Sequence, residues 1–234
     1  QLSISVFEDT NNNCSYDPDE LPVKNVKVTL NGNNIKPVDK NGQASFYNHN
    51  VENTITLEFN DEIYNECDTS YTVVFDTSNS NIHLDVPLKV LKNCEDLKPA
   101  ISSPLLRRCF DNTYYASVCN EGNKSAENVN VKILLDQYFE YVSASIPLLL
   151  QNEHVLEFDL GTIEAGECKN FRLYVNVSCD AELGQEHCID ILAISSSEPC
   201  SEDISNHYYV DCQKNIGSYD SNDKSIFVNG ARNQ

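Results

Sequence analysis

Residues 9 to 20 read DTNNNCSYDPDE and concentrate oxygen-bearing side chains within one short segment. Aligned to the twelve-position calcium loop, this segment supplies an acceptable ligand at positions one, three, five, seven, nine and twelve. In that order the ligands are Asp9, Asn11, Asn13, the main-chain carbonyl of Ser15, Asp17 and the bidentate carboxylate of Glu20. Ca²⁺ takes roughly six to eight oxygen ligands. The spacing therefore predicts one Ca²⁺ site.

The sixth position of the loop departs from the pattern. Glycine is usual there because the backbone turns with positive φ, whereas this chain has Cys14. The alternative is a turn rich in Asn and Asp, since these residues bond to their own backbone. A turn alone would not require a glutamate at the twelfth position, so the presence of Glu20 there favours the calcium site. Strand-like residues flank the loop, so we expect the ion to fasten a β-sandwich and not to act as a switch.

Composition and charge restrict the classes of partner. The chain has 234 residues, with 16 Lys and Arg against 36 Asp and Glu, giving a net charge of -20. Such a surface repels nucleic acid and anionic lipid headgroups, so neither is expected as a partner. Hydrophobic residues make up 40% and include twelve Tyr and nine Phe, which is enough for packed cores. No apolar run reaches the roughly 18 residues that a membrane span needs.

Ten cysteines, with no Met and no Trp, predict a disulfide framework in an extracellular compartment, with every cysteine oxidised. Cys14 and Cys67 are the two cysteines that lie clearly inside the first domain, so we expect them to pair. The other eight leave the connectivity open, and a short Cys179–Cys188 loop is one option because AELGQE between them reads as a turn. The metal alternative places His187 and Cys188 with nearby cysteines around zinc, but no paired CxxC supports it.

Short segments with period-two alternation and β-branched or aromatic residues dominate the chain, separated by Asn, Asp, Gly and Ser clusters. The pattern predicts an all-β protein with two immunoglobulin-like β-sandwich domains in tandem. The expected strands are 2–7, 26–30, 54–59, 71–75, 82–86, 113–119, 129–135, 155–158, 171–177, 189–194 and 207–210.

A change of composition at 92–104, KNCEDLKPAISSP, marks the expected domain boundary, because it carries prolines and little that we expect to pair in a sheet. We expect a calcium-binding sandwich at 1–92 and a disulfide-rich sandwich at 93–212, followed by a linker at 213–234. No signal peptide is visible at the N-terminus, and the C-terminal segment stops without a closing strand. We therefore expect the chain to be a fragment of a longer protein.

The sequences SISVFEDTNNNCSYDPDELPVKNVKVTL and PVDKNGQASF resemble the B-type repeats of Gram-positive serine-aspartate adhesins and their relatives in Bacteroidota surface proteins. The similarity covers most of residues 3 to 46. It implies a calcium-stabilised, immunoglobulin-like stalk domain.

The second half is similar to the conserved repeat domains of unknown function found along bacterial cell-surface proteins. The similarity lies in RRCFDNTYYASVCNEGNKSAENVNVKILLD and FDLGTIEAGECKNFRLYVNV. The matching positions are Tyr115, Asn120, Gly122, Ala126, Val129, Gly161 and Gly166. The segment GSYDSNDKSIFVNG resembles the stretch that follows such domains in large proteins of the type IX secretion pathway. This resemblance implies a further domain after residue 234.

The sequence carries no GxSxG, HExxH or phosphate-loop motif, so an enzyme is not expected. We expect a structural stalk, filament or adhesin segment of a secreted surface protein, stiffened by Ca²⁺ and disulfides. Its partners would be neighbouring domains of the same protein or other subunits of a surface assembly. One alternative is a carbohydrate- or protein-binding module that uses Tyr114, Tyr115, Tyr138 and Tyr141. A second alternative is an accessory part of a secreted enzyme.

Overall fold

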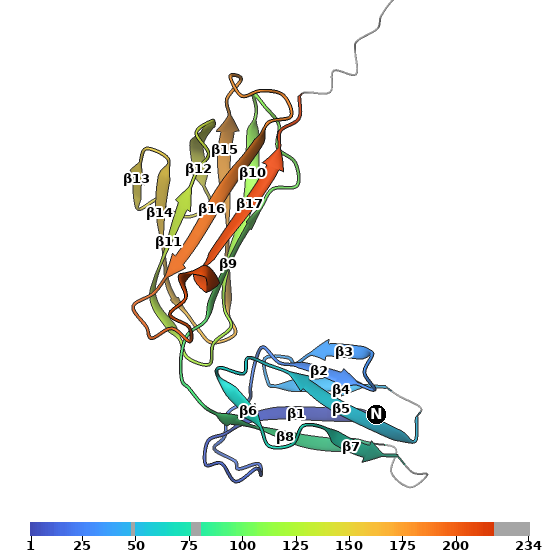
Figure 1. The fold of residues 1–234 in the computed structure, drawn as a ribbon. Coiled ribbons are helices and arrows are strands. Elements are labelled where there is room, and N and C mark those ends of the chain that lie inside the picture. Colours follow the sequence, from blue (N-terminus) through green and yellow to red (C-terminus); the bar gives the residue numbers. More distant parts are fainter. Residues whose placement is uncertain (48–49, 76–80, 218–234) are drawn as a thin grey trace, which may run out of the picture.

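The computed structural model describes residues 1–47, 50–75 and 81–217 (Figure 1). Within these ranges the chain is all-β, as predicted, and folds into two β-sandwiches with separate cores. A short 3-10 helix, η1 (Ile204–His207), precedes the last strand. No helix in the described part of the chain is long and apolar enough to cross a membrane.

Two four-stranded sheets form the first sandwich. Their strand orders are β4-β1-β8-β6 and β3-β2-β5-β7. The strands are β1 (Leu2–Asp9), β2 (Lys27–Leu30), β3 (Asn34–Pro37), β4 (Gln43–Phe46), β5 (Glu52–Glu58), β6 (Tyr64–Glu66), β7 (Tyr71–Val74) and β8 (Ile82–Val90). Alternate residues of β1 and β2, such as Leu2, Ile4 and Val28, are fully buried, because successive side chains of a strand point to opposite faces.

Strands β1 and β8 pair in parallel, from Leu2 opposite Ile82 to Asp9 opposite Lys89. Parallel neighbours end at the same edge of a sheet. The loop that follows β1 and the linker that follows β8 therefore leave the first sandwich at the same end. This end faces the second sandwich, which stands above the first in Figure 1.

The second sandwich has one four-stranded and one five-stranded sheet, with orders β12-β15-β10-β9 and β13-β14-β11-β16-β17. The strands are β9 (Leu97–Ser102), β10 (Asp111–Asn120), β11 (Ala126–Leu134), β12 (Phe139–Ala144), β13 (Leu150–Asn152), β14 (Val155–Ile163), β15 (Cys168–Val177), β16 (Glu186–Ile194) and β17 (Tyr208–Lys214). Its core contains Tyr114, Phe158 and Phe171, and the last two rings lie 5.3 Å apart.

The expectation that 92–104 contributes little to a sheet is wrong. Residues 97–102 form β9, which pairs with β10 and places Pro99 opposite Val118. Because β9 is the outer strand of its sheet, a proline that cannot donate a ladder hydrogen bond is tolerated there. At the other end, β17 continues to Lys214, past residue 212. The part of the expected linker beyond residue 217 lies outside the described residues.

Asn120 ends β10 and is fully buried where the chain enters the second sandwich. Its Oδ1 accepts hydrogen bonds from the N–H of Asp96 at 3.1 Å and of Gly122 at 3.0 Å. Its Nδ2 donates to the carbonyl oxygens of Lys124 at 2.7 Å and Ile163 at 3.0 Å. One amide thus joins the linker, the turn after β10 and the end of β14.

Replacing Asn120 with Ala should lower the free energy of unfolding of the second sandwich by about 3 kcal/mol, because buried peptide groups lose their partners. The matched control is Asn152→Ala on the exposed strand β13, which should change stability by less than about 0.5 kcal/mol. Denaturant unfolding measures both. Equal effects of the two substitutions would show that the Asn120 contacts do not stabilise the fold.

Candidate functional site

Two buried carboxylates anchor the loop at 9–20, the dark blue loop at the lower left of Figure 1. Asp9 is 0% exposed and Glu20 is 7% exposed. The Oδ1 and Oδ2 atoms of Asp9 accept the N–H groups of Asn13 and Cys14, each at 3.0 Å. Glu20 Oε1 accepts the N–H of Thr10 at 3.1 Å, and its Oε2 accepts that of Asp17 at 3.0 Å. Both carboxylates therefore point into the loop.

Three further polar side chains of the loop contact one another, namely Asn11, Asn13 and Asp17. The Asn11 and Asn13 Nδ2 atoms donate to Asp17 Oδ2 at 2.7 Å and 2.9 Å. Asn13 Oδ1 accepts the N–H of Ser15 at 2.7 Å. Rotation of an Asn side chain about its Cβ–Cγ bond exchanges the positions of its NH₂ group and its carbonyl oxygen. Asn11 and Asn13 can therefore present either a hydrogen-bond donor or an oxygen ligand to the centre of the loop.

Cys14, the residue in the place of the usual glycine, itself adopts a left-handed conformation with φ of 58°. This conformation is costly for a residue with a Cβ atom. Two contacts hold it: the N–H bond to Asp9 and the disulfide to Cys67, which confirms the predicted pairing. Ligating atoms of Asp9, Cys14 and Cys67 lie within 4.8 Å of one another, but the disulfide leaves neither sulfur as a thiolate ligand.

The carboxylates of this loop form no ion pair in the part of the chain that the structure describes. None of the ion pairs in ranges 1–47, 50–75 and 81–217 includes Asp9, Asp17 or Glu20. Burying ionised carboxylates without a counter-charge is expensive. An all-oxygen set with three carboxylates and two amides is the donor set of a hard divalent cation. The residues present therefore fit Ca²⁺.

The segment after the loop contacts the second sandwich directly. Lys24 Nζ donates to the carbonyl oxygen of Ala165 at 2.9 Å, and Asn25 Nδ2 approaches that of Asn120 at 3.4 Å. Glu8, just before the loop, accepts a 2.8 Å hydrogen bond from Tyr64. Burial raises the pKa of the Glu8 carboxyl, and hydrogen bonds from Tyr64 and Asn123 partly offset the increase. Loop 9–20 is thus followed along the chain by two residues that reach the second sandwich.

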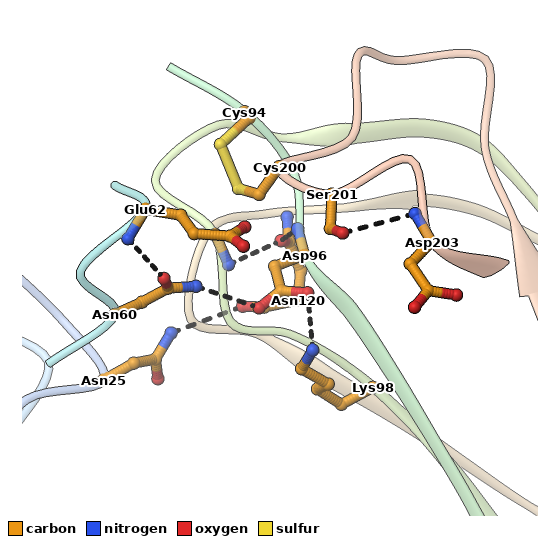
Figure 2. Close-up of polar contacts among 11 residues, drawn as sticks. Asn25, Asn60, Glu62, Cys94, Asp96, Lys98, Asn120, Cys200, Ser201 and Asp203 are labelled. Atoms are coloured by element: carbon orange, nitrogen blue, oxygen red, sulfur yellow. Dashed lines mark hydrogen bonds and ion pairs between the residues drawn. A yellow bond between two sulfur atoms is a disulfide. The ribbon is translucent and has the colours of Figure 1, made fainter. Parts of the chain in front are cut away.

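The linker at 92–96 is held by the second sandwich (Figure 2). The Cys94–Cys200 disulfide ties it to the segment before η1. Asn123 Oδ1 accepts the N–H of Cys94 at 3.0 Å, and Asn123 Nδ2 donates to the carbonyl of Lys92 at 3.1 Å. Lys92 Nζ in turn donates to the carbonyl of Pro199 at 2.9 Å. The connection between the domains is therefore not a free tether.

Asp96 lies at the centre of the junction in Figure 2. Its carboxylate contacts Lys98 Nζ at 2.7 Å and accepts a 3.3 Å hydrogen bond from Asn60 Nδ2 in the first sandwich. The Asp96 side chain is 6% exposed and that of Lys98 is 37% exposed, so this ion pair is only partly shielded from solvent. No sequence motif marked Asn60 or Asp96 as junction residues, because their partners are far apart along the chain.

All ten cysteines are paired, as predicted. The proposed Cys179–Cys188 loop is wrong, because Cys179 pairs with Cys109 and Cys188 pairs with Cys212. The remaining disulfide, Cys119–Cys168, joins directly opposed residues of β10 and β15. With Cys188 oxidised, the zinc alternative at His187 is also wrong. His187 is instead a structural residue, fully buried and bonded to Asp136 and Asn215 at 3.0 Å and 2.8 Å.

The four tyrosines suggested as a binding surface do not form one. Tyr114 is fully buried, whereas its neighbour Tyr115 points to the opposite face and is 51% exposed. Tyr138 and Tyr141 pack against the core. Adjacent strand residues face opposite sides of a sheet, so Tyr114 and Tyr115 cannot share one surface.

Comparison with known proteins gives no family. No protein-family model matches the chain, and no curated protein matches it. The CARDB domain of a Pyrococcus furiosus protein, in complex with di-metal ions, has a TM-score of 0.37 at 11% identity, covering 53% of this chain and 90% of that one. The major pilin subunit BcpA of Bacillus cereus has a TM-score of 0.38 at 9% identity, covering 92% and 68%. The sixth cohesin of Acetivibrio cellulolyticus scaffoldin B has a TM-score of 0.34 at 10% identity, covering 43% and 83%.

At TM-scores this low, the likenesses carry no argument. The resemblances to B-type repeats and to Bacteroidota surface proteins stay predictions.

Substitution of Gly122 tests whether the junction between the domains is rigid. A Cβ atom there would lie 2.3 Å from the Cys94 carbonyl oxygen and 2.7 Å from the Asp96 nitrogen, both backbone atoms of the linker. Gly122→Ala should displace the linker, lower the free energy of unfolding by roughly 1–3 kcal/mol, and change the small-angle scattering profile.

The control for this variant is Gly184→Ala. Gly184 has φ of 80° but open space around its Cβ position, so its substitution adds backbone strain without a clash. It should leave the scattering profile unchanged. An unchanged profile for Gly122→Ala as well would contradict a fixed junction.

Proposed function

We propose that the chain is a two-domain segment of a secreted cell-surface protein, serving as a stalk, filament or adhesin segment stiffened by one Ca²⁺ and five disulfides. The observation that carries the proposal is the pair of buried carboxylates, Asp9 and Glu20, which form no ion pair among the described residues. The proposed ligands are Asp9, Asn11, Asn13, the Ser15 carbonyl, Asp17 and Glu20.

The proposed ion would act on the domain junction through the chain that follows the loop. Ca²⁺ would neutralise the three carboxylates and hold 9–20 in one conformation. Residues 21–25 continue from this loop, and Lys24 and Asn25 contact Ala165 and Asn120 of the second sandwich. A fixed loop would therefore orient the second domain as well as stabilise the first.

The disulfides support an extracellular location and a mechanical role. Five disulfides persist in oxidising compartments and are rare in the cytosol. Each typically contributes about 2–4 kcal/mol by restricting the unfolded chain. Cys94–Cys200 fastens the linker to the second sandwich, and Cys14–Cys67 fastens loop 9–20 within the first.

Calcium removal gives the direct test of this proposal. At a Ca²⁺ concentration about 100 times the Kd, the ion should stabilise the chain by about 2.7 kcal/mol and raise the melting temperature by several degrees. Glu20→Gln should abolish the calcium-dependent shift, because it removes the bidentate carboxylate. The control is Asp19→Asn, which removes the neighbouring exposed carboxylate and should keep the shift.

Differential scanning calorimetry in Ca²⁺ and in chelator measures all three proteins. A wild-type melting temperature independent of Ca²⁺, or an equal loss in the two variants, would contradict the site.

A further inference from the structure

An open groove of about 690 Å³ crosses the outer face of the β12-β15-β10-β9 sheet. Its lining combines small residues of β9 and β10, such as Ala100 and Ser117, with larger side chains. The groove is unrelated to loop 9–20, because its lining comes from residues 100–209 of the second sandwich. The polar and aromatic side chains that line it include Tyr115, Ser117, Asn170, Arg172, Tyr174 and Tyr209.

The groove carries the opposite charge to the rest of the molecule. The chain as a whole has a net charge of -20, yet none of the residues that line the groove is acidic. Its single charged lining residue is Arg172. In the described part of the chain Arg172 belongs to no ion pair, and its guanidinium lies over the Tyr115 ring, 5.8 Å from the centroid. An Arg held on an aromatic ring keeps its donors free for a carboxylate.

The neutral lining suits a sugar ring. Tyr115 is 51% exposed and Tyr209 is 43% exposed, so both can offer ring surface to the C–H groups of a pyranose. Asn170 and Ser117 lie directly opposite each other on β15 and β10 and supply amide and hydroxyl groups. A mainly apolar and aromatic lining with a few fixed polar groups is typical of small-ligand sites.

The β9 edge beside the groove is not open to a peptide strand. Strand addition requires a free edge with unpaired main-chain groups. The edge that β9 leaves open lies against β17, and Gln213 Nε2 donates to the carbonyl oxygen of Ser103 at 2.5 Å. The ligand must therefore be recognised by side chains on the face of the sheet.

We propose that this groove binds a carboxylated glycan, with Arg172 pairing with the sugar carboxylate and Tyr115 and Tyr209 packing against pyranose rings. This proposal goes beyond the structural role, since a stalk needs no such groove. It would give the segment an adhesive surface directed at acidic polysaccharides.

Titration calorimetry of the intact chain at one fixed Ca²⁺ concentration tests the proposal. The probes are trigalacturonate, a hyaluronan tetrasaccharide and sialyllactose, with methyl-esterified trigalacturonate and tetraglutamate as comparison ligands. At least one carboxylated glycan should bind saturably, and esterification of trigalacturonate, if that glycan binds, should weaken binding at least tenfold. Arg172→Gln and Tyr115→Ser should each weaken binding at least tenfold.

Matched controls separate the groove from general effects of charge and surface. Arg107 is also stacked on an aromatic ring, 4.6 Å from the Phe110 centroid, but does not line the groove. Tyr47 is 78% exposed on the first sandwich. Arg107→Gln and Tyr47→Ser should bind as the wild type does, and unchanged melting temperatures would show that all four variants are folded.

Three results would overturn the proposal. The first is the absence of Arg172-dependent binding by all three carboxylated glycans at millimolar concentration. The second is tighter Arg172-dependent binding of tetraglutamate, which would identify an acidic peptide as the ligand. The third is Arg172-dependent self-association in sedimentation, which would identify a second copy of the chain as the occupant.

Discussion

The loop that follows β1 is held by two buried carboxylates, Asp9 and Glu20, which form no ion pair within the described ranges of the chain. Asp9 ends β1, and because β1 runs parallel to β8, this charge lies at the end of the sandwich from which the linker departs. A buried charge is tolerated only when a counter-charge or a dense set of hydrogen bonds compensates it. The backbone N–H groups of 10–17 supply part of this compensation. The proposed Ca²⁺ would supply the rest.

The disulfides and buried amides extend this constraint into the second sandwich. Cys14–Cys67 holds the loop against the end of β6, and Cys94–Cys200 holds the linker against the segment before η1. Asn120 and Asn123 then satisfy the polar groups of the linker backbone. These contacts link the two cores, and the proposed Ca²⁺ would add to them by holding the loop from which residues 21–25 continue. Such a joint would suit a protein that transmits force outside the cell.

Period-two alternation was sufficient to predict an all-β chain and most long strands. Alternate buried positions, such as Val26, Val28 and Leu30, require hydrophobic residues, and this requirement is visible in the sequence. The Cys14–Cys67 pair could be predicted because both residues lie within one domain. The strand β9 was missed because Pro99 argues against a strand unless its edge position is known. The other pairings depend on which strands become neighbours, as for Cys119 and Cys168. The groove at Arg172 likewise depends on the register between β10 and β15.

A crystal structure grown in millimolar Ca²⁺ is the most direct test of the calcium site. It should contain one ion inside loop 9–20, with oxygen atoms of Asp9, Asn11, Asn13, Ser15, Asp17 and Glu20 at about 2.3–2.6 Å. The Asn11 and Asn13 amides should then turn their carbonyl oxygens toward the ion. Water in the loop centre, with both Asn Nδ2 atoms still donating to Asp17, would contradict the calcium site and the calcium-dependent junction built on it.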